Sequence, residues 1–269
     1  MKAAGKKAAA ARVLPEATIS EARGVRYLHL GTPWIQGAMR LDDPLAIELE
    51  YVRRMMVWLL ARSEARQGGL RAVQLGLGAA AITRYCVKRL KMKTIAVELN
   101  PHVVAACRHW FRLPEESPLL TVLTMDAAAF VADSKRRASA DVLCVDLYDE
   151  DAASPVLDDR DFYLGCHDLL DVGGCMTVNL FGRDARADSS VARLAEVFGA
   201  AHLRQLKPTS EGNTIVLAMK QVTLPDRAEL ARRAENIETR LGLPARKWLR
   251  MMQSPPIVLP AVLPELSSP

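Results

Sequence analysis

Short apolar runs alternate with stretches of helical periodicity along most of the chain. Five runs have the length and apolar character of buried strands, at residues 71–75, 94–97, 120–123, 141–145 and 175–180. Between and after them, apolar residues recur at helical spacing over 79–90, 101–111, 127–132, 159–170 and 187–198. Strands that alternate with helices predict an α/β fold with a doubly wound, Rossmann-like, mostly parallel sheet.

The segments on either side of this alternation predict further elements. Residues 25–40 combine short apolar runs with turn residues, which favours a small β-hairpin ahead of the sheet. Asp43-Pro44 supplies a helix cap and a first-turn proline, and an apolar-periodic stretch follows. The runs at 202–206 and 214–219 lie close in sequence, so we expect an antiparallel pair at the sheet edge.

A glycine turn between the first strand and the first helix points to nucleoside binding. Residues 71–75 end at Gly76-Leu77-Gly78, and the next strand ends on Glu98. Glycines allow a tight turn, the helix N-terminus offers free N–H groups, and the acid can accept both ribose hydroxyls. The spacing Gly76-x-Gly78-x-x-Ala81 also fits a dinucleotide such as NAD, so the turn alone leaves the nucleoside open.

Acids stand at the ends of three successive predicted strands. Glu98, Asp126 and Asp146 each follow directly, or nearly so, on an apolar run. Ligands of doubly wound sheets bind beyond the carboxyl ends of the strands. We therefore expect these carboxylates to meet the glycine turn at one edge of the sheet and to form a binding site there.

These patterns divide the chain into four parts. We expect a disordered basic arm over 1–20 and a hairpin region over 21–42. The Rossmann-like nucleoside-binding catalytic domain spans 43–224. A polar, arginine-rich helix and a proline-rich tail make up 225–269.

Composition excludes several classes of partner. The net charge of +5 is spread out, without a dense basic stripe carrying interleaved aromatics, which argues against nucleic-acid binding. No apolar run reaches the roughly 18 residues that a membrane span needs. The five cysteines show no metal-like spacing and no disulfide pattern, so we expect no metal site and a reducing, cytoplasmic location.

The chain resembles the spermidine synthase family, the polyamine aminopropyltransferases, which have the class I S-adenosylmethionine-dependent methyltransferase-like fold. The resemblance runs from about Val25 to Met219. The matching segments are Trp34-Ile35-Gln36, Val73 to Gly78, Ala96 to Pro101, Leu120 to Ala127, Asp141 to Asp149, and Phe162-Tyr163.

This resemblance implies an activity and a role for each site residue. The enzyme would move an aminopropyl group from decarboxylated S-adenosylmethionine to a small polyamine and would act as a homodimer. Glu98 would bind the ribose, and Asp126 would lie near the adenine amino group. Asp146 would be the catalytic acid/base, while Asp149 and Gln36 would hold the amine.

The chemistry of the residues agrees with an amine acceptor. An alkylammonium has a pKa near 10, by analogy with lysine, so a neighbouring carboxylate must take its proton before it can react. Asp146 is the candidate base. Residues 146–161 carry seven acids and one arginine, and such a local negative field attracts a polyamine.

Two departures from the family pattern keep alternatives open. The family has an acid in the turn that contacts the donor's free amino group, and Ala79 stands in its place. The family's Tyr-x-Glu pair is matched only loosely by Glu48, Glu50 and Tyr51. The alternatives are a methyltransferase that uses intact S-adenosylmethionine, an NAD-dependent oxidoreductase, and an inactive binding or dimerisation homologue.

Overall fold

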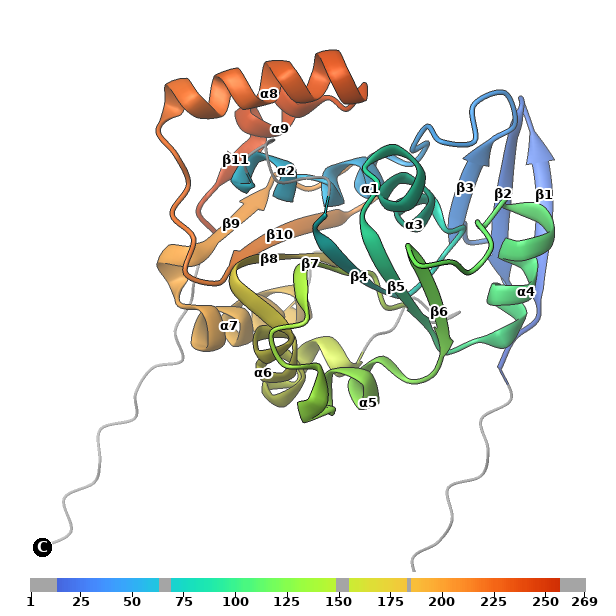
Figure 1. Ribbon diagram of the computed structural model, residues 1–269, viewed down its shortest axis with the longest axis horizontal. Helices are drawn as coiled ribbons and strands as arrows, with labels where there is room; N and C mark the ends of the chain where they lie inside the picture. The colour runs from blue at the N-terminus through green and yellow to red at the C-terminus, as the bar shows by residue number, and fades with distance from the viewer. Residues whose placement is uncertain (1–13, 63–68, 149–154, 183–184, 257–269) are drawn as a thin grey trace, which may run out of the picture.

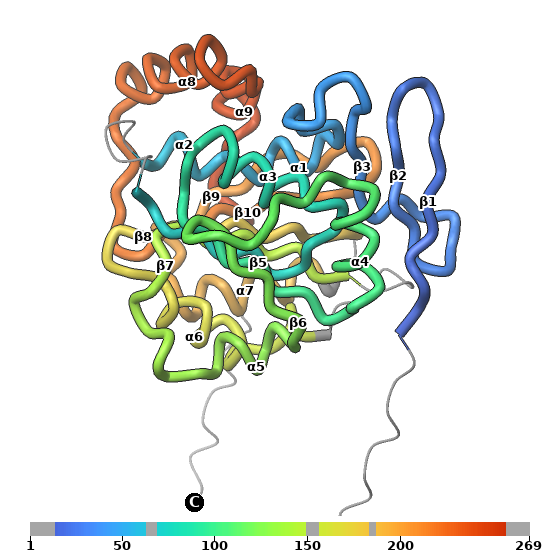
Figure 2. Tube along the Cα trace, turned by 45° about the vertical axis from the view of Figure 1, so that its right-hand side comes forward, coloured from blue at the N-terminus to red at the C-terminus, as the bar shows by residue number. Residues whose placement is uncertain are grey.

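The computed structural model of the chain describes residues 14–62, 69–148, 155–182 and 185–256 (Figure 1). In this part of the chain the strands form two sheets, one of three strands and one of eight. The smaller sheet stands beside one end of the larger, and helices cover both faces of the larger sheet (Figure 1 and Figure 2). This arrangement confirms the predicted α/β fold.

The N-terminal sheet is antiparallel and has the order β1-β2-β3, with β1 at Ala17–Ala22, β2 at Val25–Leu30 and β3 at Gly37–Arg40. Strands β2 and β3 form the predicted hairpin. The sequence did not predict β1, which begins inside the segment expected to be a disordered arm. Its outer residues are exposed and polar, and only Ala17 and Ile19 pack against the core, so β1 lacks an apolar run.

The main sheet has the order β11-β9-β10-β8-β7-β4-β5-β6. Its strands are β4 Arg71–Leu75, β5 Lys93–Glu98, β6 Leu120–Thr124, β7 Ala140–Val145, β8 Leu170–Phe181, β9 Leu203–Leu206, β10 Asn213–Met219 and β11 Met252–Gln253. Strands β6, β5, β4, β7 and β8 run parallel to one another. Strand β10 pairs antiparallel with both β8 and β9, which confirms the predicted edge pair. Strand β11 adds to β9 from outside and was not predicted.

Helices pack on each face of the main sheet (Figure 1), and 3₁₀ turns lie between some elements of the described chain. One face is covered by α1 Glu50–Met55, α2 Trp58–Ala61, α3 Ala81–Arg84 with its π-helical continuation η2 Tyr85–Arg89, α8 Arg227–Leu241 and α9 Ala245–Met251. The other face is covered by α5 Ala127–Ala132, α6 Arg160–Leu169 and α7 Ala185–Phe198. Helix α4, Pro101–Trp110, packs with the N-terminal sheet. The 3₁₀ turns are η3 Ser134–Arg136, η4 Pro155–Asp158 and η5 Ala200–His202.

The helix expected from Asp43 onward begins later than predicted, because α1 starts only at Glu50. The Asp43 carboxylate instead accepts hydrogen bonds from the amides of Leu45 and Ala46 and closes a turn. Asp43 does accept backbone hydrogen bonds as a cap would, but it caps a turn, and α1 begins several residues after that turn.

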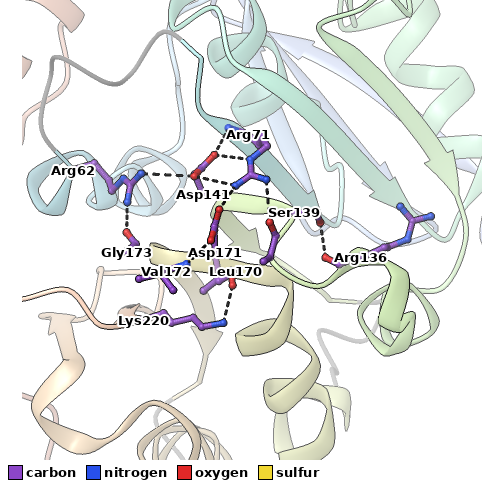
Figure 3. Close-up of polar contacts among 11 residues, drawn as sticks. Arg62, Arg71, Arg136, Ser139, Asp141, Leu170, Asp171, Val172, Gly173 and Lys220 are labelled. Carbon is purple, nitrogen blue, oxygen red and sulfur yellow. Dashed lines mark hydrogen bonds and ion pairs between the residues drawn. The ribbon is translucent and has the colours of Figure 1, made fainter.

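Charged side chains gather at the amino ends of β4 and β7 (Figure 3). The predicted site lies at the other ends of these strands, their carboxyl ends. Arg71 donates to Asp141 and Asp171, and Arg62 lies near Asp141 and donates to the Gly173 carbonyl. These ion pairs join β4, β7 and the start of β8. Within the described residues, no helix combines the length and apolar character that crossing a membrane requires.

Candidate functional site

A cavity of about 890 Å³ opens between the N-terminal sheet and the carboxyl edge of the main sheet. Six of the seven residues predicted for the site line it: Gln36, Gly76, Gly78, Glu98, Asp126 and Asp146. The seventh, Asp149, lies outside the described residues. The structure therefore brings together at one cavity every predicted site residue that it describes.

The glycine turn is shaped by what packs against it. Gly76 and Gly78 have φ values of 84° and 51°, in the left-handed region that favours glycine. A Cβ on Gly76 would overlap the carbonyl oxygen of Asp146, and one on Gly78 would lie 3.0 Å from the carbonyl oxygen of Gln36. Small residues at these positions let the turn approach both β7 and the N-terminal sheet.

Glu98 ties the glycine turn to the end of β5. Its two carboxylate oxygens accept hydrogen bonds from the amides of Leu77 and Asn100, each at 2.8 Å. Burial raises the pKa of Glu98, and these amide bonds offset part of that shift. A carboxylate has about four acceptor positions, so two amides leave capacity for ribose hydroxyls.

Asp126 lies at the end of β6 and caps helix α5. Its carboxylate accepts a hydrogen bond from the amide of Ala129 at 2.8 Å. Capping alone explains an acid at this position. The residue is nevertheless exposed and lines the cavity, and the strand before it, β6, pairs with β5, which ends at Glu98.

Asp146 lines the cavity and directly follows β7. The side-chain amide of Asn179 donates to its carboxylate at 2.8 Å, and the Tyr51 hydroxyl also hydrogen-bonds to it. Burial raises the pKa of Asp146, and these two hydrogen bonds offset part of the shift. A carboxylate with a raised pKa beside an open cavity is suited to accept a proton.

Several residues of the site were not assigned a role from sequence. Asn179 of β8 bridges Asp146 and Asn213, whose side-chain amide donates to the Asn179 side-chain oxygen at 3.1 Å. An asparagine near the carboxyl end of a mostly apolar predicted strand was the signal that could have revealed it. Tyr51, from α1, was named only as part of a loose match to the family's Tyr-x-Glu pair, and its contact with Asp146 arises from the tertiary fold.

Aromatic side chains form one wall of the cavity. The ring centroids of Trp34 and Phe181 lie 6.5 Å apart, and those of Tyr148 and Phe181 lie 6.2 Å apart, both with edge-to-face geometry. The Tyr148 hydroxyl donates to the Asn179 carbonyl and accepts from the Phe181 amide. The wall is therefore fixed to β8 and also touches the N-terminal sheet through Trp34.

The position of Ala79 explains one departure from the family pattern. Ala79 is buried, it does not line the cavity, and it packs against Gly37 so closely that a Cβ on Gly37 would overlap its amide nitrogen. A larger side chain at position 79 would have to displace β3. In this protein the position belongs to the packing between the two sheets.

The cavity carries acidic charge without a basic side chain in its described lining. Its carboxylates are Glu48, Glu50, Glu98, Asp126, Asp146 and Glu211, and the described lining residues include no lysine, arginine or histidine. Glu50 is paired with two bases that do not line the cavity, Arg54 at 2.6 Å and Lys247 at 2.8 Å. Among the described residues, no group of His, Cys, Asp and Glu is arranged to hold a metal ion.

Comparison with known proteins identifies relatives over most of the chain. No protein-family model matches it. A polyamine aminopropyltransferase of Chromobacterium violaceum is 34% identical over 236 residues, covering 87% of this chain and 88% of that protein. A polyamine aminopropyltransferase of Neisseria meningitidis is 31% identical over 237 residues, with the same coverage.

Solved structures with lower sequence identity share the fold. A probable spermidine synthase from Corynebacterium glutamicum has a TM-score of 0.70 at 21% identity and covers 92% of this chain and 95% of that chain. Spermidine synthase from Thermotoga maritima has a TM-score of 0.56 at 15% identity, covering 87% and 84%. With relatives above 30% identity over 87% of the chain and the predicted fold in place, the chain belongs to the polyamine aminopropyltransferase family, a family of transferases, as the resemblance predicted.

Proposed function

We propose that this protein transfers an aminopropyl group from decarboxylated S-adenosylmethionine to a small polyamine, with Asp146 as the base. The observation that carries the proposal is the position of Asp146, whose pKa is raised by burial, in the lining of an acidic cavity beside the glycine turn. Family membership supports the reaction type, since the relatives are named for aminopropyl transfer.

The adenosine end of the donor would occupy the glycine-turn side of the cavity. Gly76 and Gly78 let the backbone approach the nucleoside, Glu98 would accept the ribose hydroxyls, and Asp126 would face the adenine amino group. The acceptor would lie on the other side of Asp146. Gln36 would contact it there, and the prediction for Asp149 stands although that residue lies outside the described part of the chain.

The charge of the cavity favours the decarboxylated donor over the intact one. Intact S-adenosylmethionine carries a carboxylate on its amino-acid tail, and the described cavity lining offers that group no basic side chain. Glu48 and Asp146 would instead repel it, whereas the bare ammonium of the decarboxylated donor would be attracted. The loss of the family acid at Ala79 therefore does not remove the preference for an ammonium tail.

The chain's residues would assist a single displacement. The amine nitrogen attacks the propyl carbon bonded to the sulfonium sulfur, the C–N bond forms, and the C–S bond breaks to release methylthioadenosine. The neutral thioether leaves with the bonding electron pair, and Asp146 accepts the proton that the amine nitrogen gives up. Alignment of the two substrates within one cavity supplies the rest of the acceleration.

A donor-comparison assay tests this proposal. The purified chain is incubated with 1,4-diaminobutane and either decarboxylated or intact S-adenosylmethionine, and methylthioadenosine and the elongated polyamine are quantified. We expect turnover only with the decarboxylated donor. Methyl transfer from the intact donor, or no product from either, would overturn the proposal.

The Asp146→Asn variant separates binding from chemistry. We expect it to bind methylthioadenosine normally in calorimetry while its turnover falls by about 10²- to 10⁴-fold. An unchanged rate would remove Asp146 from the mechanism. The homodimer and the cytoplasmic location stay predictions, and light scattering of the purified chain tests the first.

A further inference from the structure

Glu211 is a carboxylate of the cavity that the proposed function leaves without a role. It lies in the loop between β9 and β10, far in sequence from the motifs of the site. Of the other cavity carboxylates, Glu98 and Asp126 are assigned to the adenosine, Glu48 to the donor's ammonium tail and Asp146 to proton transfer. Glu50 is already paired with Arg54 and Lys247, so it has less capacity for a ligand cation.

Buried hydrogen bonds connect the Glu211 loop to Asp146. Asn179 donates to Asp146 at 2.8 Å, and Asn213 donates to Asn179 at 3.1 Å. Thr209 then closes the loop, because its amide donates to the Asn213 carbonyl at 2.8 Å and its hydroxyl accepts from the Asn213 amide at 3.1 Å. Asn179, Asn213 and Thr209 are all buried, and a satisfied buried network of this kind holds its members in one geometry.

The loop places the charge of Glu211 at the acceptor side of the cavity. Glu211 follows Thr209 and precedes Asn213, so the hydrogen bonds that position Asp146 also position the loop that carries Glu211. Hydrogen bonds from its own backbone amide and from the Ser210 and Thr209 hydroxyls lower the pKa of Glu211, which keeps it ionised at neutral pH. Arg54 of α1 donates to the Lys207 carbonyl just after β9, which ties the start of this loop to the helix that carries Glu50, and both glutamates line the cavity.

We propose that Glu211 binds the ammonium group at the far end of the acceptor and thereby selects acceptors that carry a second positive charge. The inference rests on the proposed function. Asp146 takes the proton from the attacking nitrogen, while Glu211 holds the other end of the same molecule in a fixed relation to it. Asn179, Asn213 and Thr209 are positioning residues for both carboxylates.

Substrate truncation and mutation together test this role. The Glu211→Gln variant keeps the size of the side chain and removes its charge. We expect its kcat/KM for 1,4-diaminobutane to fall by about tenfold, mainly through KM, since a charge-assisted hydrogen bond is lost. With 1-aminobutane, which has no far ammonium, wild type and variant should agree within about twofold.

A binding measurement keeps the inference testable without turnover. Calorimetric titration of the two amines into methylthioadenosine-saturated protein should show the same selective loss in the variant. Glu235→Gln, which changes an exposed glutamate of α8, is the matched control and should alter neither amine. An equal loss for both amines, or no loss for the diamine, would overturn the role of Glu211.

The two proposals fail in different ways. If wild type transfers no aminopropyl group yet binds the diamine more tightly than Glu211→Gln does, the proposed function is wrong and the binding role stands. If wild type is active and the variant retains full affinity for the diamine, the proposed function stands and the binding role is wrong. If wild type binds neither amine, both are wrong.

Discussion

Gly76 and Asp146 touch through their backbones at the centre of the site. The place that a Cβ would take on Gly76 is filled by the carbonyl oxygen of Asp146, and the Asp146 amide donates to the Leu75 carbonyl at 2.9 Å. The turn that would receive the nucleoside therefore also fixes the backbone of the proposed base. A change at Gly76 should disturb both.

Gly76→Ala should destabilise the protein by more than backbone strain alone would. Gly24, in the turn between β1 and β2, has a similar φ of 75° and open space around its Cβ position, so Gly24→Ala is a matched control. We expect about 1–2 kcal/mol for the control and about 2–5 kcal/mol for Gly76→Ala, which adds a steric clash. Urea unfolding measures the free energy of unfolding of both variants. Equal losses would show that the contact between Gly76 and Asp146 does not add to the destabilisation.

The pH dependence of turnover should respond to Tyr51. As a base, Asp146 is active when ionised, so the rate is lost as the pH falls through its pKa. Burial raises that pKa above the ordinary 3.8, and the hydrogen bond from Tyr51 offsets part of the shift. Tyr51→Phe removes that bond, so the pKa rises further and the acidic limb of the kcat profile should move to higher pH.

Another tyrosine of the cavity wall gives the control for this profile. Tyr27→Phe changes a side chain from β2 that also lines the cavity. Its acidic limb should coincide with that of wild type. A limb in Tyr51→Phe that stays in place or moves to lower pH would contradict the proposed coupling between the two residues.

The strand-end acids could be predicted because their signals are local. Glu98, Asp126 and Asp146 each stand at or just after the end of an apolar run, and parallel strands place those ends at one edge of a sheet. The fold class, the edge pair β9–β10 and the glycine turn follow from the same short-range patterns. No alignment or tertiary information was needed for them.

The acceptor side could not be predicted in the same way. Tyr51, Asn179 and Glu211 come from a helix, an inner strand and a loop that converge only in the folded chain. The late start of α1 and the burial of Ala79 against Gly37 likewise depend on how the two sheets pack. Sequence patterns report what each element is, and the contacts between elements require the tertiary structure.

The ionised carboxylate of Asp141 should stabilise the folded protein, and this contribution should be lost at low pH. Burial alone would raise its pKa, but the hydrogen bonds and charge of Arg71 and the charge of Arg62 outweigh this, and the pKa of Asp141 is lowered in the folded protein (Figure 3). A lowered folded-state pKa gives stability that is present above the ordinary value of 3.8 and is lost as the pH falls through the folded-state pKa.

Asp141→Asn should therefore be less stable than wild type by about 1–3 kcal/mol at neutral pH. The difference should shrink as the pH falls below the ordinary value of 3.8 toward the lowered folded-state pKa, where the wild-type carboxylate also becomes protonated. Asp168→Asn, which removes a solvent-exposed ion pair with Arg137, should change stability by less than about 1 kcal/mol. Urea unfolding between pH 3 and 7 measures all three proteins, and a deficit that is the same at every pH would contradict the ionic origin.

In the wild-type protein, the positive charge of Lys247 should weaken binding of the acceptor, although this residue does not line the cavity. It reaches from α9 to Glu50, and its hydrogen bond, together with that of Arg54, holds the pKa of Glu50 at about 2. Lys247→Met leaves Glu50 ionised at neutral pH, because the ordinary pKa is 4.5, but removes part of the compensating positive charge. The cavity becomes more negative, so the KM for a diamine should fall by about two- to fivefold.

Two further KM measurements, one at added salt and one on a second lysine variant, distinguish the local effect of Lys247 on Glu50 from an effect of the protein's net charge. Added salt should bring the Lys247→Met and wild-type KM values together, since exposed charges are screened. Lys135→Met removes an identical charge from η3, outside the cavity lining, and should leave KM unchanged. A fall of equal size in both variants would assign the effect to the net charge of the protein, and an unchanged or higher KM in Lys247→Met would show that Glu50 does not act on the acceptor.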